Sequence, residues 1–110
     1  MPQPSPASVP LYSTLAGDPD LGAIVAVFVE EMPERVDNVI RFLNRGDREQ
    51  LRRAAHQLKG AAGSYGFDPI TSAAARLEDA IRQSRPDEDI RQASDDLVEL
   101  CRQARAGTPP

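Results

Sequence analysis

The sequence predicts an all-α fold, an antiparallel up-and-down four-helix bundle with a short extra helix on its N-terminal side. Three observations support this prediction. Apolar residues recur every three or four positions through most of the chain, cap and turn residues separate these stretches, and no segment shows the alternation of a strand. A chain of 110 residues is long enough for one domain with one core. Helices joined by short connections pack as antiparallel neighbours, which favours the bundle.

We expect this domain to span residues 11–105 and to lie between two tails. Four prolines fall within residues 1–10, and residues 106–110 contain one glycine and two prolines. Both tails are expected to be disordered, because such segments do not continue a helix and lie at the chain ends. The short extra helix is predicted at Leu11–Ala16, with its two leucines packed over one end of the bundle.

The first long helix is predicted to begin at Asp18-Pro19, which is typical of a cap followed by proline at the first helical position. Its apolar stripe continues across Pro33 and consists of Leu21, Ile24, Val25, Phe28, Met32, Val36, Val39, Ile40 and Leu43. A proline in a helix interior removes one backbone hydrogen bond and bends the axis. The stretch therefore forms either one bent helix or two abutting helices, and we favour the bent helix.

The central helix is predicted to run from Asp47 to Tyr65. Gly46 ends the preceding helix, and Asp47 with Gln50 three residues later forms an aspartate-led analogue of a capping box. Gly66 is the expected terminator. The apolar stripe of this helix consists of Leu51, Ala55, Leu58, Ala62 and Tyr65.

Two further helices complete the predicted bundle. Asp68-Pro69 repeats the cap-and-proline signal, and Ser84–Asp87 is the expected last turn. The apolar face of the first of these helices consists of Ile70, Ala73, Ala74, Leu77 and Ile81. That of the second consists of Ile90, Ala93, Leu97, Leu100, Cys101 and Ala104.

Composition excludes several classes of function. A net charge of −4, no tryptophan and only five aromatic rings argue against a nucleic-acid partner. No apolar run approaches the roughly 20 residues needed to cross a bilayer, and the N-terminus lacks the apolar part of a signal peptide. The single cysteine and single histidine leave neither an internal disulfide nor a zinc site. We therefore expect a cytoplasmic protein without membrane, metal or nucleic-acid partners.

The most informative stretch, Ala55–Gly66, contains the only histidine of the chain, His56. On a wheel of about 100° per residue, His56, Lys59, Gly60 and Gly63 lie within roughly 100° of one another and point away from the apolar stripe. Each glycine costs about 1 kcal/mol relative to alanine in a helix interior. Its physical use here is to clear side chains from beside the imidazole, so that another protein can approach the ring. This exposed strip is a candidate docking site, and it favours a monomer.

The residue types in the strip indicate the chemistry. A neutral imidazole is a competent nucleophile at cellular pH. Lys59, one helical turn after His56, can reach a phosphoryl group placed on the ring. Together they indicate phosphohistidine. Arg52 and Arg53, one turn before His56, add positive charge, and they belong either to the docking face or to an ordinary solvated surface.

A known family carries the same pattern: a histidine, two residues, a lysine–glycine pair, and a further glycine ten residues after the histidine. His56, Lys59, Gly60 and Gly66 meet it here. The flanking segment FVEEMPERVDNVIRFLNRGDREQLRRAAHQLKG fits as well. On these residues the sequence closely resembles a histidine-containing phosphotransfer (HPt) domain, the module of multistep two-component phosphorelays. The resemblance covers roughly Asp20–Cys101.

The resemblance implies roles for individual residues. His56 would accept the phosphoryl group, Lys59 would neutralise its oxygens, and Gly60 would keep the neighbouring face open. In several family members a glutamine or glutamate on the following helix hydrogen-bonds the histidine ring, and the residue twenty-two positions after His56 is Glu78. An acceptor for Nδ1–H would fix the tautomer and leave Nε2 free to attack. Glu78 is therefore the candidate orienting residue; the alternative is a surface glutamate paired with Arg82.

The resemblance also implies the partners. A response-regulator receiver domain would dock over Gly60 and Gly63 and contribute an aspartate and Mg²⁺. The phosphoryl group would pass from this aspartate, or from a hybrid histidine kinase, to His56 and then to another response regulator. The chain is expected to act as a carrier rather than an enzyme and to bind no cofactor itself, and no GxxxxGK[ST] loop for ATP is present.

Two alternatives stay open. The first is a binding module that docks a receiver or a kinase and blocks it without carrying phosphate. Loss of the histidine or the lysine would mark such a module, and both are present. The second is a phosphotransfer domain that a histidine kinase phosphorylates directly, as in chemotaxis kinases. Those domains normally come fused to dimerisation and ATP-binding modules, which these 110 residues do not contain.

Overall fold

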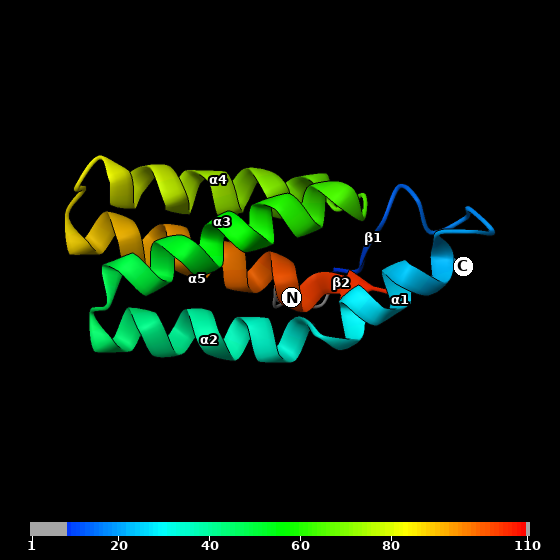
Figure 1. Ribbon diagram of the computed structural model, residues 1–110, viewed down its shortest axis with the longest axis horizontal. Coiled ribbons are helices and arrows are strands. Elements are labelled where there is room, and N and C mark those ends of the chain that lie inside the picture. The colour runs from blue at the N-terminus through cyan, green and yellow to red at the C-terminus, as the bar shows by residue number, and fades with distance from the viewer. Residues whose placement is uncertain (1–8, 110) are drawn as a thin grey trace, which may run out of the picture.

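The computed structural model describes residues 9–109 and is a helical bundle, as predicted. Four long helices, α2 to α5, lie side by side, and α1 and a small strand pair lie toward one end of them (Figure 1). Contacts between α2 and α3, α3 and α4, α4 and α5, and α2 and α5 close the bundle. The elements are β1 (Leu11–Tyr12), α1 (Gly22–Glu30), α2 (Met32–Arg45), α3 (Arg48–Ser64), α4 (Asp68–Arg82), α5 (Asp87–Gln103) and β2 (Ala104–Arg105).

The apolar stripes predicted from the sequence form the core between these helices. α3 and α4 contribute the residues that matter most for the site, because their buried faces meet. The buried apolar residues of these two helices are Leu51, Ala55, Leu58, Ala62, Ile70, Ala73, Ala74, Leu77 and Ile81. None of the helices in the described part of the chain is both long and apolar enough to cross a membrane.

The turn between α2 and α3 forms as the sequence predicts. Gly46 has φ 68°, a left-handed conformation that ends α2, and its N–H donates to the carbonyl of Leu43 at 3.1 Å. The side chain of Asp47 accepts a hydrogen bond from the backbone N–H of Gln50 at 3.1 Å. These caps set the start of the helix that carries His56.

The prediction of a single bent helix across Pro33 is wrong. α1 ends at Glu30 and α2 begins at Met32, so the chain forms the two abutting helices that we considered as the alternative. Pro33 lies in the first turn of α2, where its missing N–H has no partner within the helix to lose. Phe28 anchors α1 to the rest of the fold.

The ring of Phe28 packs in an aromatic cluster at the C-terminal end of α3. Its centroid lies 5.0 Å from that of Tyr65 and 5.7 Å from that of Phe67. Phe28 lies on α1, whereas Tyr65 caps the end of α3 and Phe67 caps the start of α4. The cluster therefore ties α1 to the connection between α3 and α4.

Two predicted helix starts are displaced along the chain. Asp18 accepts hydrogen bonds from the backbone N–H groups of Asp20 and Leu21 at 2.7 and 3.2 Å, so it caps a turn, and α1 begins later, at Gly22. Asp68 is the first residue of α4 rather than its cap, and Phe67 takes the cap position.

The prediction of a helix at Leu11–Ala16 is also wrong, as is the expectation that no segment forms a strand. Leu11–Tyr12 forms β1, which pairs in parallel with β2, so that Leu11 lies opposite Ala104. Leu11 and Leu15 nevertheless pack against the core, as expected. β-strand formation here depends on a partner more than 90 residues later in the chain, which local periodicity does not reveal.

The two predicted tails fall largely beyond the elements. Of residues 1–10, residues 1–8 lie outside the described part of the chain, and Val9 and Pro10 belong to no helix or strand. Residues 106–109 also belong to no helix or strand, and Pro110 lies outside the described part.

The N-terminal segment after β1 packs tightly on the end of α3 at Gly66. The N–H of Thr14 donates to the carbonyl of Gly66 at 3.0 Å, and the hydroxyl of Ser13 donates to the carbonyl of Tyr65. Gly66 has φ 79°, and a Cβ there would lie only 2.7 Å from the hydroxyl oxygens of Ser13 and Thr14. A glycine is therefore required at this position both by the backbone and by the close approach of a distant segment.

We predict opposite effects of alanine at two glycines of the same motif. Gly66→Ala should lower the free energy of unfolding by about 1–3 kcal/mol, because of strain and the contact with the N-terminal segment. Gly60→Ala should raise it by about 0.5–1 kcal/mol, because a helix interior favours alanine and a Cβ at Gly60 meets nothing within 4 Å.

Urea unfolding followed by circular dichroism measures both effects. Equal changes in the two variants would contradict this assignment of Gly66 as the structural glycine.

Candidate functional site

His56 lies on the outer face of α3, opposite the buried stripe. Its side chain is 59% exposed, whereas Ala55 before it and Leu58 after it are buried. The helical wheel predicts this orientation correctly. The imidazole is therefore open to another molecule on one side and rests on α4 on the other.

Glu78, on α4, lies directly beside the histidine ring. Its Oε2 is 2.7 Å from Nδ1 of His56. The Glu78 side chain is only 1% exposed, so it is not the surface glutamate of the alternative interpretation. The close approach of α3 and α4 that brings the two side chains together is permitted by the small residues on their facing sides, Ala55, Ala62, Ala73 and Ala74.

The Glu78 carboxylate has three partners that use both of its oxygens. Nζ of Lys59 donates to Oε1 at 2.5 Å, and Nη2 of Arg82 lies 3.2 Å from Oε2, the oxygen that also contacts His56. The hydrogen bond from Lys59 is the largest cause that lowers the pKa of Glu78 below its ordinary value, followed by the hydrogen bond from His56 and the positive charge of Arg82, against the opposing effect of burial. The carboxylate is therefore ionised at neutral pH.

An ionised carboxylate determines which ring nitrogen carries the proton. Because Glu78 can only accept, Nδ1 of His56 must be the donor of their hydrogen bond. In a neutral ring this leaves the lone pair on Nε2, the nitrogen that does not contact Glu78. The arrangement can therefore present Nε2 as a nucleophile.

Packing within the described part of the chain gives no reason for the two glycines of the strip. A Cβ at Gly60 would meet nothing within 4 Å, and a Cβ at Gly63 would only make ordinary contact with Thr71, at 3.5 Å from its hydroxyl oxygen. Both residues are exposed. Glycine lowers helix stability by about 1 kcal/mol relative to alanine, and packing among the described residues gives no reason for this loss at Gly60.

Arg52 and Arg53 both bind Glu49 on the preceding turn of α3. Nη2 of Arg52 lies 2.7 Å from Oε1 of Glu49, and Nε of Arg53 lies 3.2 Å from the same oxygen. The pKa of Arg52 is raised, first by Glu49 and to a smaller extent by the charge of Glu78. Arg52 is thus electrostatically coupled to the site, while neither guanidinium hydrogen-bonds His56 or Lys59.

Arg82 is the site residue to which the sequence analysis assigned no function. Its spacing of four residues from Glu78 was visible in the sequence, and this spacing suggested only a surface pair. Because Glu78 is buried, this pair is more than a surface ion pair: Arg82 balances the negative charge of a carboxylate that is only 1% exposed.

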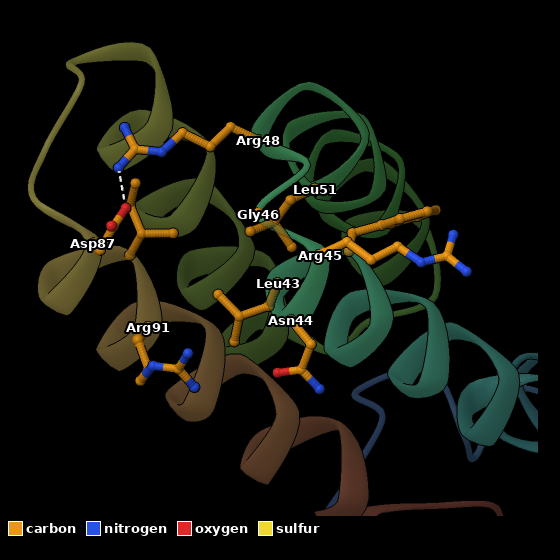
Figure 2. Close-up of a pocket in the computed structure, with 10 residues that line it drawn as sticks. Leu43, Asn44, Arg45, Gly46, Arg48, Leu51, Asp87 and Arg91 are labelled. Atoms are coloured by element: carbon orange, nitrogen blue, oxygen red, sulfur yellow. Dashed lines mark hydrogen bonds and ion pairs between the residues drawn. The ribbon is translucent and has the colours of Figure 1, made fainter.

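The cavity drawn in Figure 2 lies elsewhere. It has a volume of about 370 Å³ and lies between the α2–α3 turn and the start of α5, where Arg48 pairs with Asp87. None of the candidate site residues lines it. Within residues 9–109, no three histidine, cysteine, aspartate or glutamate side chains are grouped so that they could hold a metal ion. His56, whose side chain is 59% exposed, thus lies on the surface and away from this cavity.

Comparison with known proteins agrees with this geometry. The chemotaxis protein CheA of Rhizobium meliloti (strain 1021) is 31% identical over 105 residues, which cover 80% of this chain and 14% of that protein. The chain thus spans a small part of the length of this relative. No solved structure matches. The family described as "Hpt domain" matches residues 23–107, a stretch that includes the whole candidate site. The chain therefore belongs to the Hpt family, the histidine-containing phosphotransfer domains of two-component signalling.

Proposed function

We propose that this chain carries a phosphoryl group on His56 between receiver domains in a multistep phosphorelay. The observation that supports this most directly is an exposed imidazole whose Nδ1 is held by a buried, ionised carboxylate and whose Nε2 is free. Membership of the Hpt family supports the same proposal. The donor is an aspartyl phosphate of a receiver domain, or a hybrid histidine kinase, and the acceptor is another response regulator.

In the proposed reaction, Nε2 of His56 attacks the phosphorus in line with the bond to the donor aspartate. The N–P bond forms as the P–O bond breaks, and the aspartate leaves as a carboxylate. No proton has to leave the ring, because the proton stays on Nδ1, hydrogen-bonded to Glu78, throughout. The positive charge that develops on the imidazole is stabilised by the ionised carboxylate, and Lys59 neutralises the phosphoryl oxygens.

The partner supplies what this chain does not. A receiver domain brings the aspartate and its Mg²⁺, and this chain binds no cofactor and has no kinase site of its own. The bare backbone at Gly60 and the exposed Gly63 lie within one or two helical turns of His56, which supports docking over them. Arg52 and Arg53 contribute positive charge to the edge of this docking face.

Three further features complete the proposal. The four long helices form an antiparallel up-and-down bundle, and their alternating course in Figure 1 supports this. The protein works in the cytoplasm as a monomer, since the docking face must stay free for receivers.

The similarity to a chemotaxis protein favours a second candidate. In this candidate, a histidine kinase phosphorylates His56 directly. The two candidates differ in the phosphoryl donor and share the same acceptor residue, so incubation with a kinase and ATP, without any receiver, distinguishes them.

We predict that His56→Gln abolishes phosphate uptake and leaves the fold nearly unchanged, because the exposed ring contributes little to the core. The purified chain is incubated with Mg²⁺ and a receiver that carries a labelled phosphoryl group on its aspartate. The measurement is the acid-labile, base-stable label that appears on the chain. The exposed neighbour Gln57 provides the control substitution, Gln57→Ala. Label on His56→Gln equal to that on the wild type would overturn the assignment.

A charged side chain at Gly60 should interfere with docking but not with folding. We predict that Gly60→Glu slows phosphate transfer from a receiver by about tenfold or more, through bulk and repulsion of the phosphoryl group, while the helix content is retained. Gly60→Ala is the matched control and should retain more of the rate. Unchanged transfer by Gly60→Glu would remove Gly60 from the docking face.

The lowered pKa of Glu78 predicts a pH dependence of stability. A carboxylate whose pKa is lower in the folded state stabilises the fold at pH values above its ordinary pKa. This stabilisation is lost as the pH falls through the folded-state pKa. As the pH falls below the ordinary pKa of a glutamate, the free energy of unfolding of the wild type should therefore decrease more than that of Glu78→Gln.

Urea titrations at each pH measure this difference, with Asp79→Asn, at an exposed carboxylate on the same helix, as the control. Parallel pH profiles of wild type and Glu78→Gln would contradict the role of the ionised carboxylate.

A further inference from the structure

Lys59 is already engaged in the structure, which raises a problem for its proposed role. It is the only lysine of the chain, and its ammonium donates to Oε1 of Glu78. To neutralise a phosphoryl group on His56, the ammonium must turn away from this carboxylate. With Lys59 in place the Glu78 side chain is only 1% exposed, so the carboxylate relies on protein partners rather than on water. The departure of Lys59 would leave a buried charge without its strongest hydrogen bond.

Arg82 is placed to compensate for this loss. Its guanidinium lies 3.2 Å from Oε2, the oxygen that Lys59 does not use, so it stays in contact when Lys59 leaves. The side chain is 55% exposed and reaches Glu78 from four residues along the same helix. Arg82 is the only arginine that pairs with Glu78 among the described residues, since Arg52 and Arg53 bind Glu49.

We infer that Arg82 is a positioning residue for phosphoryl transfer: it holds Glu78 in place against Nδ1 of His56 while Lys59 moves from Glu78 to the phosphoryl group. This inference rests on the proposed function. In the exchange, the Lys59 ammonium gives up its hydrogen bond to a carboxylate oxygen of Glu78 and forms one to a phosphoryl oxygen. The N–P bond forms at Nε2, the bond from phosphorus to the donor breaks, and no proton changes its atom.

Loss of Arg82 also has an effect in the unphosphorylated chain. Without Arg82, the Glu78 carboxylate depends more strongly on Lys59, which is then held more tightly. The Lys59 amine should therefore react more slowly with a small acylating reagent. Because the chain has one lysine, acetylation at this position is read directly from a peptide map.

The chain offers a closely matched control for the loss of an arginine. Arg85 is 56% exposed and pairs with Asp89, also four residues away, at 2.6 Å. Arg82→Gln and Arg85→Gln thus each remove one half-exposed charge from one such pair, and only the first touches the site. Circular dichroism verifies that both variants fold.

The test measures two rates in the full chain for the wild type, Arg82→Gln, Arg82→Lys and Arg85→Gln. The first is phosphate uptake from phosphoramidate, a small donor that releases ammonia as the phosphorus–nitrogen bond to the ring forms. The second is acetylation of Lys59 by acetic anhydride in the unphosphorylated chain. We expect Arg82→Gln to slow both by about threefold or more, Arg82→Lys to recover part of the uptake rate, and Arg85→Gln to match the wild type.

Each outcome bears on one of the two proposals. If Arg82→Gln matches Arg85→Gln in both rates while the wild type takes up phosphate, the role of Arg82 is overturned and the proposed function stands. If the wild type takes up no phosphate from phosphoramidate or from receivers, the proposed function fails. In that case, slower acetylation of Arg82→Gln would still establish the coupling between Arg82 and Lys59, and an unchanged rate would overturn it.

Discussion

The buried carboxylate of Glu78 is the constraint on which the rest of the site depends. Removing a carboxylate from water costs several kcal/mol unless other groups hydrogen-bond to it and balance its charge. Here His56 and Lys59 approach from α3 and Arg82 approaches from α4. Because His56 and Lys59 lie one turn apart, they reach different oxygens of the same group. A shift of α4 by one turn would break the contacts of Glu78 with His56 and with Lys59. These contacts therefore fix the register of α3 against α4 as well as the orientation of the imidazole ring.

Of the three partners of this carboxylate, His56 and Arg82 stay in the proposed exchange and Lys59 leaves. The imidazole is held through Nδ1, which leaves Nε2 as the ring nitrogen that does not contact Glu78. The Lys59 ammonium is attached to a flexible stem and is 34% exposed, so it can exchange partners without movement of the helix. A rigid imidazole and a mobile ammonium on one face suit a carrier, which must present its nucleophile in a fixed orientation and adapt to the charge of what it carries.

The sequence allowed prediction of the features that depend on local interactions. The apolar spacing of α2 to α5, the left-handed Gly46 and the Asp47 cap each depend on residues within one or two turns. One error involves a distant partner, since Leu11–Tyr12 becomes a strand because Ala104–Arg105 lies beside it. Others are local: Pro33 lies in the first turn of a new helix rather than inside a bent one, and α1 begins later than Asp18 predicted. For the site, the helical wheel placed His56 outside the core, whereas the proximity of Glu78 came from the family resemblance.

The glycines of the motif show why a pattern by itself does not separate structure from function. Gly66 is required within this chain, because its left-handed backbone and its contact with Ser13 exclude any side chain. Gly60 meets no atom that would exclude one, and it weakens the helix that carries the nucleophile. Both positions belong to the same sequence pattern, yet among the described residues only the first is explained by packing. The helix stability lost at Gly60 therefore supports the proposed docking of a partner one turn from His56.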